Sequence, residues 1–290
     1  MGFMPRERVV PLFVYRTTPV SVCVRGRGRT SAFGGHRGRL GKRGVGGPMG
    51  TAVAAPVRLS VRRGDESVVE DLEWPSVPLG LLREARPWRT FRWYKGQQHY
   101  SGTYWSATVG DHVIYESRLE LGRLLFADFA PEVRHIVAQP FLLKADVDGK
   151  VRKHIPDYLL VTDDGPVVVD VKPSHRLEKP EVAFTFAWTR EAVTSRGWQY
   201  EVWSEPDPYV LENVRFLAGY RRAWLFNPDL VSALRAADLD GMSLGDAFRL
   251  QPQCPRPLVK SAVLHLLWSG HVTTALGRPL RSGHMLRRAA

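Results

Sequence analysis

The chain has 290 residues, of which 44% are apolar, and it carries a formal net charge of +12 at pH 7. That length allows one good-sized domain plus a small one, and that apolar content allows a buried core. The chain has no run of about 18 uncharged apolar residues, which a membrane-spanning helix needs, and its start lacks a secretory pattern. The two cysteines, Cys23 and Cys254, form neither a zinc site nor a disulfide framework. We therefore expect a protein of the reducing cytoplasm.

Most of the positive charge lies in residues 1–50, which hold ten arginines and lysines against the single acid Glu7. This Gly/Arg-rich head cannot bury enough apolar surface to fold, and we expect it to be disordered. One interpretation is a nucleic-acid-binding arm. The other is an upstream extension from a misplaced start codon, with Met49-Gly50 as the true beginning. DNA binding must therefore be judged from the body of the chain.

Residues 51–86 are expected to be a loosely structured lead-in, with an acidic patch and the breakers Pro75 and Pro78. From residue 87 to 105, aromatic and basic residues interleave, a mixture that suits stacking and backbone contacts on a nucleic acid. Arg92 and Lys95 are the candidate DNA contacts in this segment. The same mixture suits a half-buried β-ribbon packed on a core, and both interpretations stay open.

Residues 115–128 are predicted to form a helix, because leucines recur through them and no proline interrupts them. Glu116 and Glu120 lie four positions apart and therefore share one face of that helix. The face is either functional or an ordinary solvated face shared with Arg118 and Arg123.

Strand-like runs follow at residues 134–139 and 141–145, then in the stretch that carries Asp157 and ends at Val161, and again at 167–172. Asp148-Gly149 and Asp164-Gly165 are predicted hairpin turns between these runs. A helix over residues 179–195 and a strand over 198–203 complete the series. The fold class is therefore α/β, with the order αβββαβ and a mixed sheet.

The remainder of the chain, from about residue 213, is mostly helical in pattern, and proline and glycine interrupt it in several places. An apolar helix over residues 260–268 precedes a small predicted hairpin. Together they resemble a winged-helix module, but a small all-α cap is equally compatible.

Two acids flank the hairpin that turns at Asp164-Gly165. Folding the chain there brings Asp157 roughly opposite Asp170, and the period of 2 in a strand points Asp170 and Lys172 to the same face. Like charges that face each other across a sheet are destabilising. The pattern therefore indicates a divalent-cation site, and its alternative is a solvent-facing Asp/Lys pair on an edge strand.

This element order, with Pro156-Asp157 followed by Asp170-Val171-Lys172, resembles the PD-(D/E)xK nuclease superfamily. Residues 115–120 in the preceding helix and Gln139-Pro140-Phe141 at the entry to the strands make the chain similar to the TnsA family, the endonuclease subunits of heteromeric transposases. The resemblance spans residues 87–225. Some TnsA proteins carry glutamine two positions before the lysine, where this chain has Asp170, the usual residue of the superfamily.

The resemblance implies a restriction-endonuclease-like core and Mg²⁺-dependent hydrolysis of DNA, with Mn²⁺ able to substitute. It implies that Asp157, Asp170, Glu120 and the Val171 carbonyl hold the metal, and that Lys172 orients the attacking water or stabilises the transition state. Two residues are possible accessories: Glu116 is an alternative to Glu120, and Gln139 either contacts phosphate or is a buried residue that caps strand ends. Lys153 and His154 are candidate DNA contacts or ordinary exposed strand residues.

By the same resemblance we expect a metal-dependent DNA endonuclease that cuts the 5′ ends of a mobile element. Double-stranded DNA at the transposon ends, an integrase-type transposase subunit and a regulatory AAA+ ATPase are the implied partners. The alternatives are a stand-alone nuclease of restriction or repair, and a catalytically inactive DNA-binding assembly subunit. The expected domains are the disordered head (1–50), the lead-in (51–86), a PD-(D/E)xK endonuclease domain (87–212) and a helical or winged-helix-like C-terminal domain (213–290).

Overall fold

The computed structural model describes residues 53–89 and 100–289. The predictions for the basic head, for a start at Met49, and for Arg92 and Lys95 as DNA contacts lie outside these residues. Within them the mixed α/β class expected from the sequence is confirmed: helices alternate with strands that form several separate sheets.

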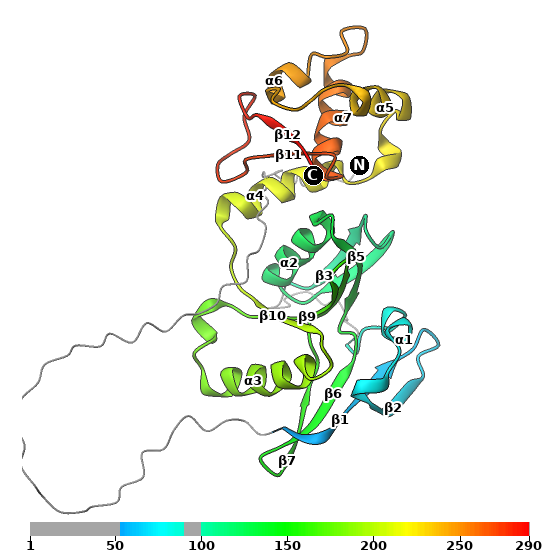
Figure 1. Ribbon diagram of the computed structural model, residues 1–290, viewed down its shortest axis with the longest axis vertical. Coiled ribbons are helices and arrows are strands. Elements are labelled where there is room, and N and C mark those ends of the chain that lie inside the picture. The colour runs from blue at the N-terminus through cyan, green and yellow to red at the C-terminus, as the bar shows by residue number, and fades with distance from the viewer. Residues whose placement is uncertain (1–52, 90–99, 290) are drawn as a thin grey trace, which may run out of the picture. The chain divides into compact units, whose positions relative to one another are not determined.

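A four-stranded sheet positions the residues singled out from the sequence (Figure 1). Its strands are β5 (Val133–Ala138), β8 (Tyr158–Thr162), β9 (Gly165–Val171) and β10 (Gln199–Trp203), in the order β10-β9-β8-β5. Strands β8 and β9 form the predicted hairpin, in which Thr162 pairs with Gly165. Strand β10 runs parallel to β9, and helix α3 (Pro180–Thr194) lies between them along the chain, as parallel pairing requires. The predicted hairpin and helix are confirmed.

Helices α2 (Arg118–Phe129) and α3 pack on opposite faces of this sheet, because alternate strand residues enter different apolar clusters. Val169 of β9 packs in the cluster that contains Leu124 of α2. Its neighbour Val168 packs in the cluster that contains Trp188 of α3. Asp170 is two residues after Val168 on β9 and therefore lies on the same face of the sheet, the face that α3 covers.

The expectation of a loosely structured lead-in is wrong for residues 53–83. They form β1 (Val53–Arg62), β2 (Val68–Glu73), a 3-10 turn η1 (Trp74–Ser76) and α1 (Leu79–Arg83). Val57, Leu59 and Val61 alternate with polar residues and are buried, a period of 2 typical of a half-buried strand. Trp74 is fully buried against Phe141 and donates its indole N–H to the Ala192 carbonyl at 2.6 Å. The segment is therefore part of the folded core.

A second sheet joins this segment to the middle of the chain, in the order β2-β1-β6-β7, with β6 at Leu142–Val147 and β7 at Lys150–His154. The turn at Asp148 and Gly149 is as predicted, and both residues have positive φ, as a tight hairpin turn demands. The expected continuous strand up to Val161 is wrong. It breaks before Asp157 into β7 and β8, which belong to different sheets, since Pro156 cannot donate to a ladder.

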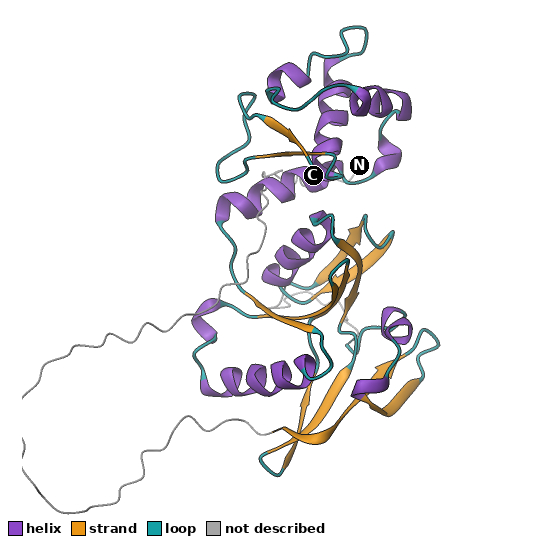
Figure 2. Cartoon of the chain, in the orientation of Figure 1, coloured by secondary structure: helices purple, strands orange, loops and turns teal. Residues whose placement is uncertain are grey.

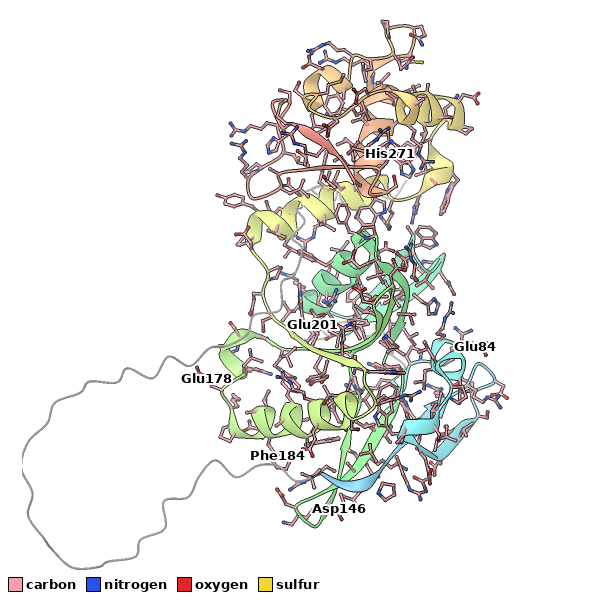
Figure 3. The ribbon with its side chains drawn as sticks, viewed as in Figure 1. Glu84, Asp146, Glu178, Phe184, Glu201 and His271 are labelled. Atoms are coloured by element: carbon pink, nitrogen blue, oxygen red, sulfur yellow. The ribbon has the colours of Figure 1, made fainter. Side chains whose placement is uncertain are left out.

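A two-stranded ribbon, β3 (Gly102–Ser106) with β4 (Asp111–Tyr115), precedes α2. This supports the β-ribbon interpretation for residues 102–105. The predicted helix start at Tyr115 is three residues early, because Tyr115 ends β4 and Ser117 caps α2. The alternative of a solvated helix face fails at Arg123, which is buried and donates to Glu201 of β10 at 2.8 Å. Glu201 is labelled in Figure 3.

A buried carboxylate fastens the ribbon to α2. Asp128 of α2 accepts four hydrogen bonds, from the Tyr104 hydroxyl at 2.6 Å, the Ser106 hydroxyl at 2.5 Å, the Ala107 N–H at 3.0 Å and the Thr108 N–H at 2.7 Å. Burial, and then the charge of Asp128, raise the pKa of Tyr104. The Tyr104 hydroxyl therefore stays protonated and remains a donor.

The C-terminal part is mostly helical (Figure 2). Its helices are α4 (Pro208–Leu217), α5 (Pro228–Ala236), α6 (Leu244–Ala247) and α7 (Arg256–Trp268), with 3-10 turns η3 (Ala218–Tyr220) and η4 (Ala223–Leu225). Another 3-10 turn, η2 (Ser174–Arg176), lies earlier in the chain, between β9 and α3. After α7, strand β11 (Val272–Thr274) pairs antiparallel with β12 (Leu286–Arg288), so the all-α alternative is wrong. In the part of the chain that the structure describes, no helix is long and apolar enough to cross a membrane.

Candidate functional site

Asp157 and Asp170 lie opposite each other at the end of the β8–β9 hairpin. Tyr158 pairs with Val169, so the next residues outward on the two strands are these two acids. The Val171 N–H donates to Asp157 Oδ2 at 2.6 Å. Burial raises the pKa of Asp157 well above its usual value, and the charges of Asp170 and Glu120 raise it further. The structure therefore places Asp157, Asp170 and Glu120 close enough for their charges to interact.

Asp170 is buried, with 2% of its surface exposed, and both of its carboxylate oxygens are engaged. His154 Nε2 lies 2.8 Å from Oδ1, and the Tyr200 hydroxyl donates to Oδ2. Burial raises the pKa of Tyr200, and the neighbouring charge of Asp170 raises it further. The hydroxyl therefore remains a donor to the carboxylate.

Glu120 lies in the first turn of α2, and its side chain bonds back to the residues that begin the helix. The Ser117 hydroxyl accepts from the Glu120 N–H at 3.1 Å and donates to Glu120 Oε1 at 2.8 Å. The Glu116 N–H donates to Glu120 Oε2 at 2.6 Å. Burial raises the pKa of Glu120, while the charge of Lys172 lowers it.

Lys172 is placed by the strand ladder, because its N–H continues the parallel pairing and donates to the Trp203 carbonyl at 2.9 Å. Its positive charge lowers the pKa of both Glu120 and Asp157. The lysine therefore lies close enough to stabilise the anionic forms of both acids.

The family comparison covers this hairpin and its flanking elements. Residues 130–205 match the family described as the TnsA-like endonuclease N terminal. The chain carries a TnsA-like endonuclease domain. None of the curated proteins compared with the chain matches it. The matched residues of the TnsA-like domain include Asp157, Asp170 and Lys172, whereas Glu116 and Glu120 precede them.

Glu116 and Gln139 form a hydrogen-bonded network that adjoins Glu120 and Asp157. Gln139 Nε2 donates to Glu116 Oε1 at 2.6 Å, its Oε1 accepts from the Arg89 N–H at 2.9 Å, and its own N–H donates to the Asp157 carbonyl at 2.9 Å. Arg89 also forms an ion pair with Glu116 at 2.9 Å. Gln139 is buried with a positive φ, so the structure places it as the buried residue of the second interpretation. Its contact with phosphate stays a prediction.

The two candidate DNA contacts on β7 differ in their surroundings. Lys153 is exposed. His154 is largely buried, and its Nε2 is engaged by Asp170. The role of His154 as a DNA contact stays a prediction, but the structure assigns its Nε2 another partner.

The donors of this candidate site suit a hard cation in kind, since carboxylates and a backbone carbonyl are the ligands that Mg²⁺ prefers. Across the described ranges, however, no group of three or more His, Cys, Asp and Glu side chains could hold a metal ion as placed. Five of the six carboxylate oxygens of Glu120, Asp157 and Asp170 already accept hydrogen bonds from protein donors. Each such oxygen retains a further lone pair, so the donors fit in kind.

Sequence reasoning missed three residues of this site. The Ser-x-x-Glu pattern at Ser117 and Glu120 is a readable capping-box signal. Tyr200 gives no such signal, because its partner follows only from the parallel register of β9 with β10. Arg89 gives none either, because its partner Gln139 has a positive φ that the sequence does not show.

Replacing Asp157 by asparagine is expected to stabilise the metal-free protein near neutral pH. A carboxyl group with a higher pKa in the folded chain than in the unfolded chain favours unfolding once the pH exceeds the unfolded value. The free energy of unfolding of the wild type should therefore fall as the pH rises from about 4 through the raised pKa, and the variant should lack this fall. Urea denaturation in chelator measures it. Asp164→Asn, at an exposed turn, is the control, and parallel curves for wild type and Asp157→Asn would contradict the expectation.

Proposed function

We propose that this chain is a divalent-metal-dependent DNA endonuclease that cuts the 5′ ends of a mobile element within a heteromeric transposase. The observation that carries the proposal is the juxtaposition of Asp157, Asp170 and Lys172 at one end of a hairpin inside a TnsA-like domain. Asp157, Asp170 and Glu120 lie near one another with a single nearby lysine, and the repulsion between their negative charges lowers folding stability. A cation and a phosphate would explain it.

The order of elements supports the proposed restriction-endonuclease-like core. If β6 and β7 are treated as an excursion into the second sheet, the remaining order is α2, β5, β8, β9, α3, β10. This is the αβββαβ order, with the acids on the hairpin. For the C-terminal part, a helix followed by a short antiparallel pair is the feature that supports a winged-helix module.

In the proposed reaction, Asp157, Asp170, Glu120 and the Val171 carbonyl hold Mg²⁺. The ion supplies Lewis acidity and a more acidic water. Asp157 is the most available of the acids, since only its Oδ2 accepts a hydrogen bond among the described residues. Lys172 places a positive charge beside the same acids, where it can hold the attacking water or offset charge that develops on the phosphate.

The partners implied by the proposal are double-stranded DNA at the transposon ends, an integrase-type transposase subunit that processes the 3′ ends, and a regulatory AAA+ ATPase. The cytoplasm is the proposed location. A stand-alone nuclease would cut without such partners, so comparing cleavage by the chain alone with cleavage after a transposase subunit is added separates the two roles.

One observation favours a second candidate, a catalytically inactive assembly subunit. Asp170 is buried, and its two carboxylate oxygens are already engaged by His154 and Tyr200. An inactive subunit would retain this cluster as a folding device and would bind DNA without an ion.

Calorimetric titration of Mn²⁺ tests the proposal. The wild type should bind the ion, Asp157→Ala should not, and Asp163→Ala should bind as the wild type does, because Asp163 is an exposed turn residue paired with Arg134. With the transposase subunit added, cleavage of supercoiled plasmid DNA in Mn²⁺ should be lost in the same variant. Equal titration curves for all three proteins would contradict the metal site and favour the inactive subunit.

A further inference from the structure

The surroundings of Asp170 contain two side chains to which the proposed reaction gives no role. Its oxygens accept from His154, at the end of β7 in the second sheet, and from Tyr200, in β10. Asp170 itself lies on β9. Three strands from two sheets therefore converge on one carboxylate that is 2% exposed.

Aromatic side chains of α3 fix the position of the His154 ring. The ring meets Trp188 edge-on at a centroid distance of 6.2 Å and Phe186 at 6.4 Å. Its side chain is 17% exposed. With the ring held by these contacts, Nε2 remains directed at Asp170 Oδ1.

The Tyr200 ring is fixed independently. Its residue pairs with Val168 in the parallel ladder, and the Arg190 guanidinium of α3 lies over the ring at 5.4 Å from the centroid. The hydroxyl group therefore reaches Asp170 from β10, which pairs with β9 on the edge opposite to β8. The two donors leave Asp170 little freedom to rotate.

A carboxylate held in this way can still bind an ion, because each oxygen has a second lone pair. Hydrogen bonds from neighbouring groups orient the ligands of metal sites, and their removal typically costs about 10- to 100-fold in metal affinity. A carboxylate whose bonds serve only folding would show no such dependence.

We propose that His154 and Tyr200 are positioning residues that hold Asp170 in place for a divalent cation. The inference rests on the proposed function. Neither residue is assigned contact with the ion or with DNA; both act through the orientation of Asp170.

The test is Mn²⁺ titration of the full-length chain with substitutions that remove single donors. Tyr200→Phe deletes the hydroxyl and keeps the ring that Arg190 covers, so it should remain folded and bind Mn²⁺ about 10- to 100-fold more weakly. His154→Leu should weaken binding similarly, and His154→Gln, which restores an N–H donor, should recover part of the loss. Tyr209→Phe, at a tyrosine that is 53% exposed, is the matched control and should bind as the wild type does.

Wild-type affinity, or tighter binding, in a folded Tyr200→Phe protein overturns the proposal, because the hydroxyl then serves folding alone or competes with the ion. If His154→Leu does not fold, Tyr200→Phe and His154→Gln decide the result. A wild type that binds no Mn²⁺ overturns the proposed function together with this inference. Wild-type binding with unaffected variants overturns this inference alone.

Discussion

Replacement of Lys172 by methionine is expected to slow DNA cleavage by about 100- to 1,000-fold, the size of effect seen when one group that stabilises developing charge is removed. The charge of Lys172 lowers the pKa of both Glu120 and Asp157. Methionine has a similar length and flexibility, so packing should change little.

Single-turnover cleavage of a labelled duplex, with saturating Mn²⁺ and the transposase subunit added, gives the rate. Lys179→Met is the matched control, since Lys179 is exposed at the start of α3. Circular dichroism and the melting temperature show whether the variant is folded. Cleavage by folded Lys172→Met within about threefold of the wild type would contradict the role, since a single catalytic charge is worth far more.

Replacement of Asp128 by alanine is expected to lower the free energy of unfolding by about 3 kcal/mol or more, because four donors lose their acceptor in a buried place. Asp128→Asn should cost less, since the remaining carbonyl oxygen still accepts. The single variants Tyr104→Phe and Ser106→Ala should each cost about 1 kcal/mol.

Urea denaturation at neutral pH measures all four variants, and Asp111→Ala provides the control, because Asp111 is exposed on the same ribbon. A loss below about 1 kcal/mol for Asp128→Ala would show that the ribbon does not depend on this carboxylate. Asp128 is not among the proposed cleavage residues, so residual cleavage by the folded fraction should keep the wild-type rate.

The local part of this fold was predictable from short-range signals. The turn chemistry of Asp164-Gly165 and the alternation of the flanking valines define the hairpin, and the hairpin defines which acids face each other. The same reasoning failed where pairing is long-range. Nothing near residues 53–62 indicates that β1 pairs with β6. Pro156 marks a break in the strand, but nothing near it indicates that β7 and β8 enter different sheets.

The candidate site divides in the same way. Asp170 lies on β9, and Asp157 and Lys172 lie one residue beyond the ends of β8 and β9, so their proximity follows from hairpin pairing and strand periodicity. The hydrogen bonds from His154 and Tyr200 to Asp170 depend on the parallel register of β9 with β10 and on the end of β7. Those contacts are set by tertiary packing, which a single sequence does not encode in any short pattern.

The β1–β6 pairing also sets an order of events during synthesis of the chain. Leu59 pairs with Leu143, more than 80 residues later, so the edge of β1 stays open until β6 has left the ribosome. At about 5–20 residues per second, translation of this stretch takes several seconds. During that time β1 and β2 can form only an isolated hairpin, which is marginally stable in water. His154 is among the first residues to follow β6, so the second sheet can close before Asp170 and Tyr200 have left the ribosome.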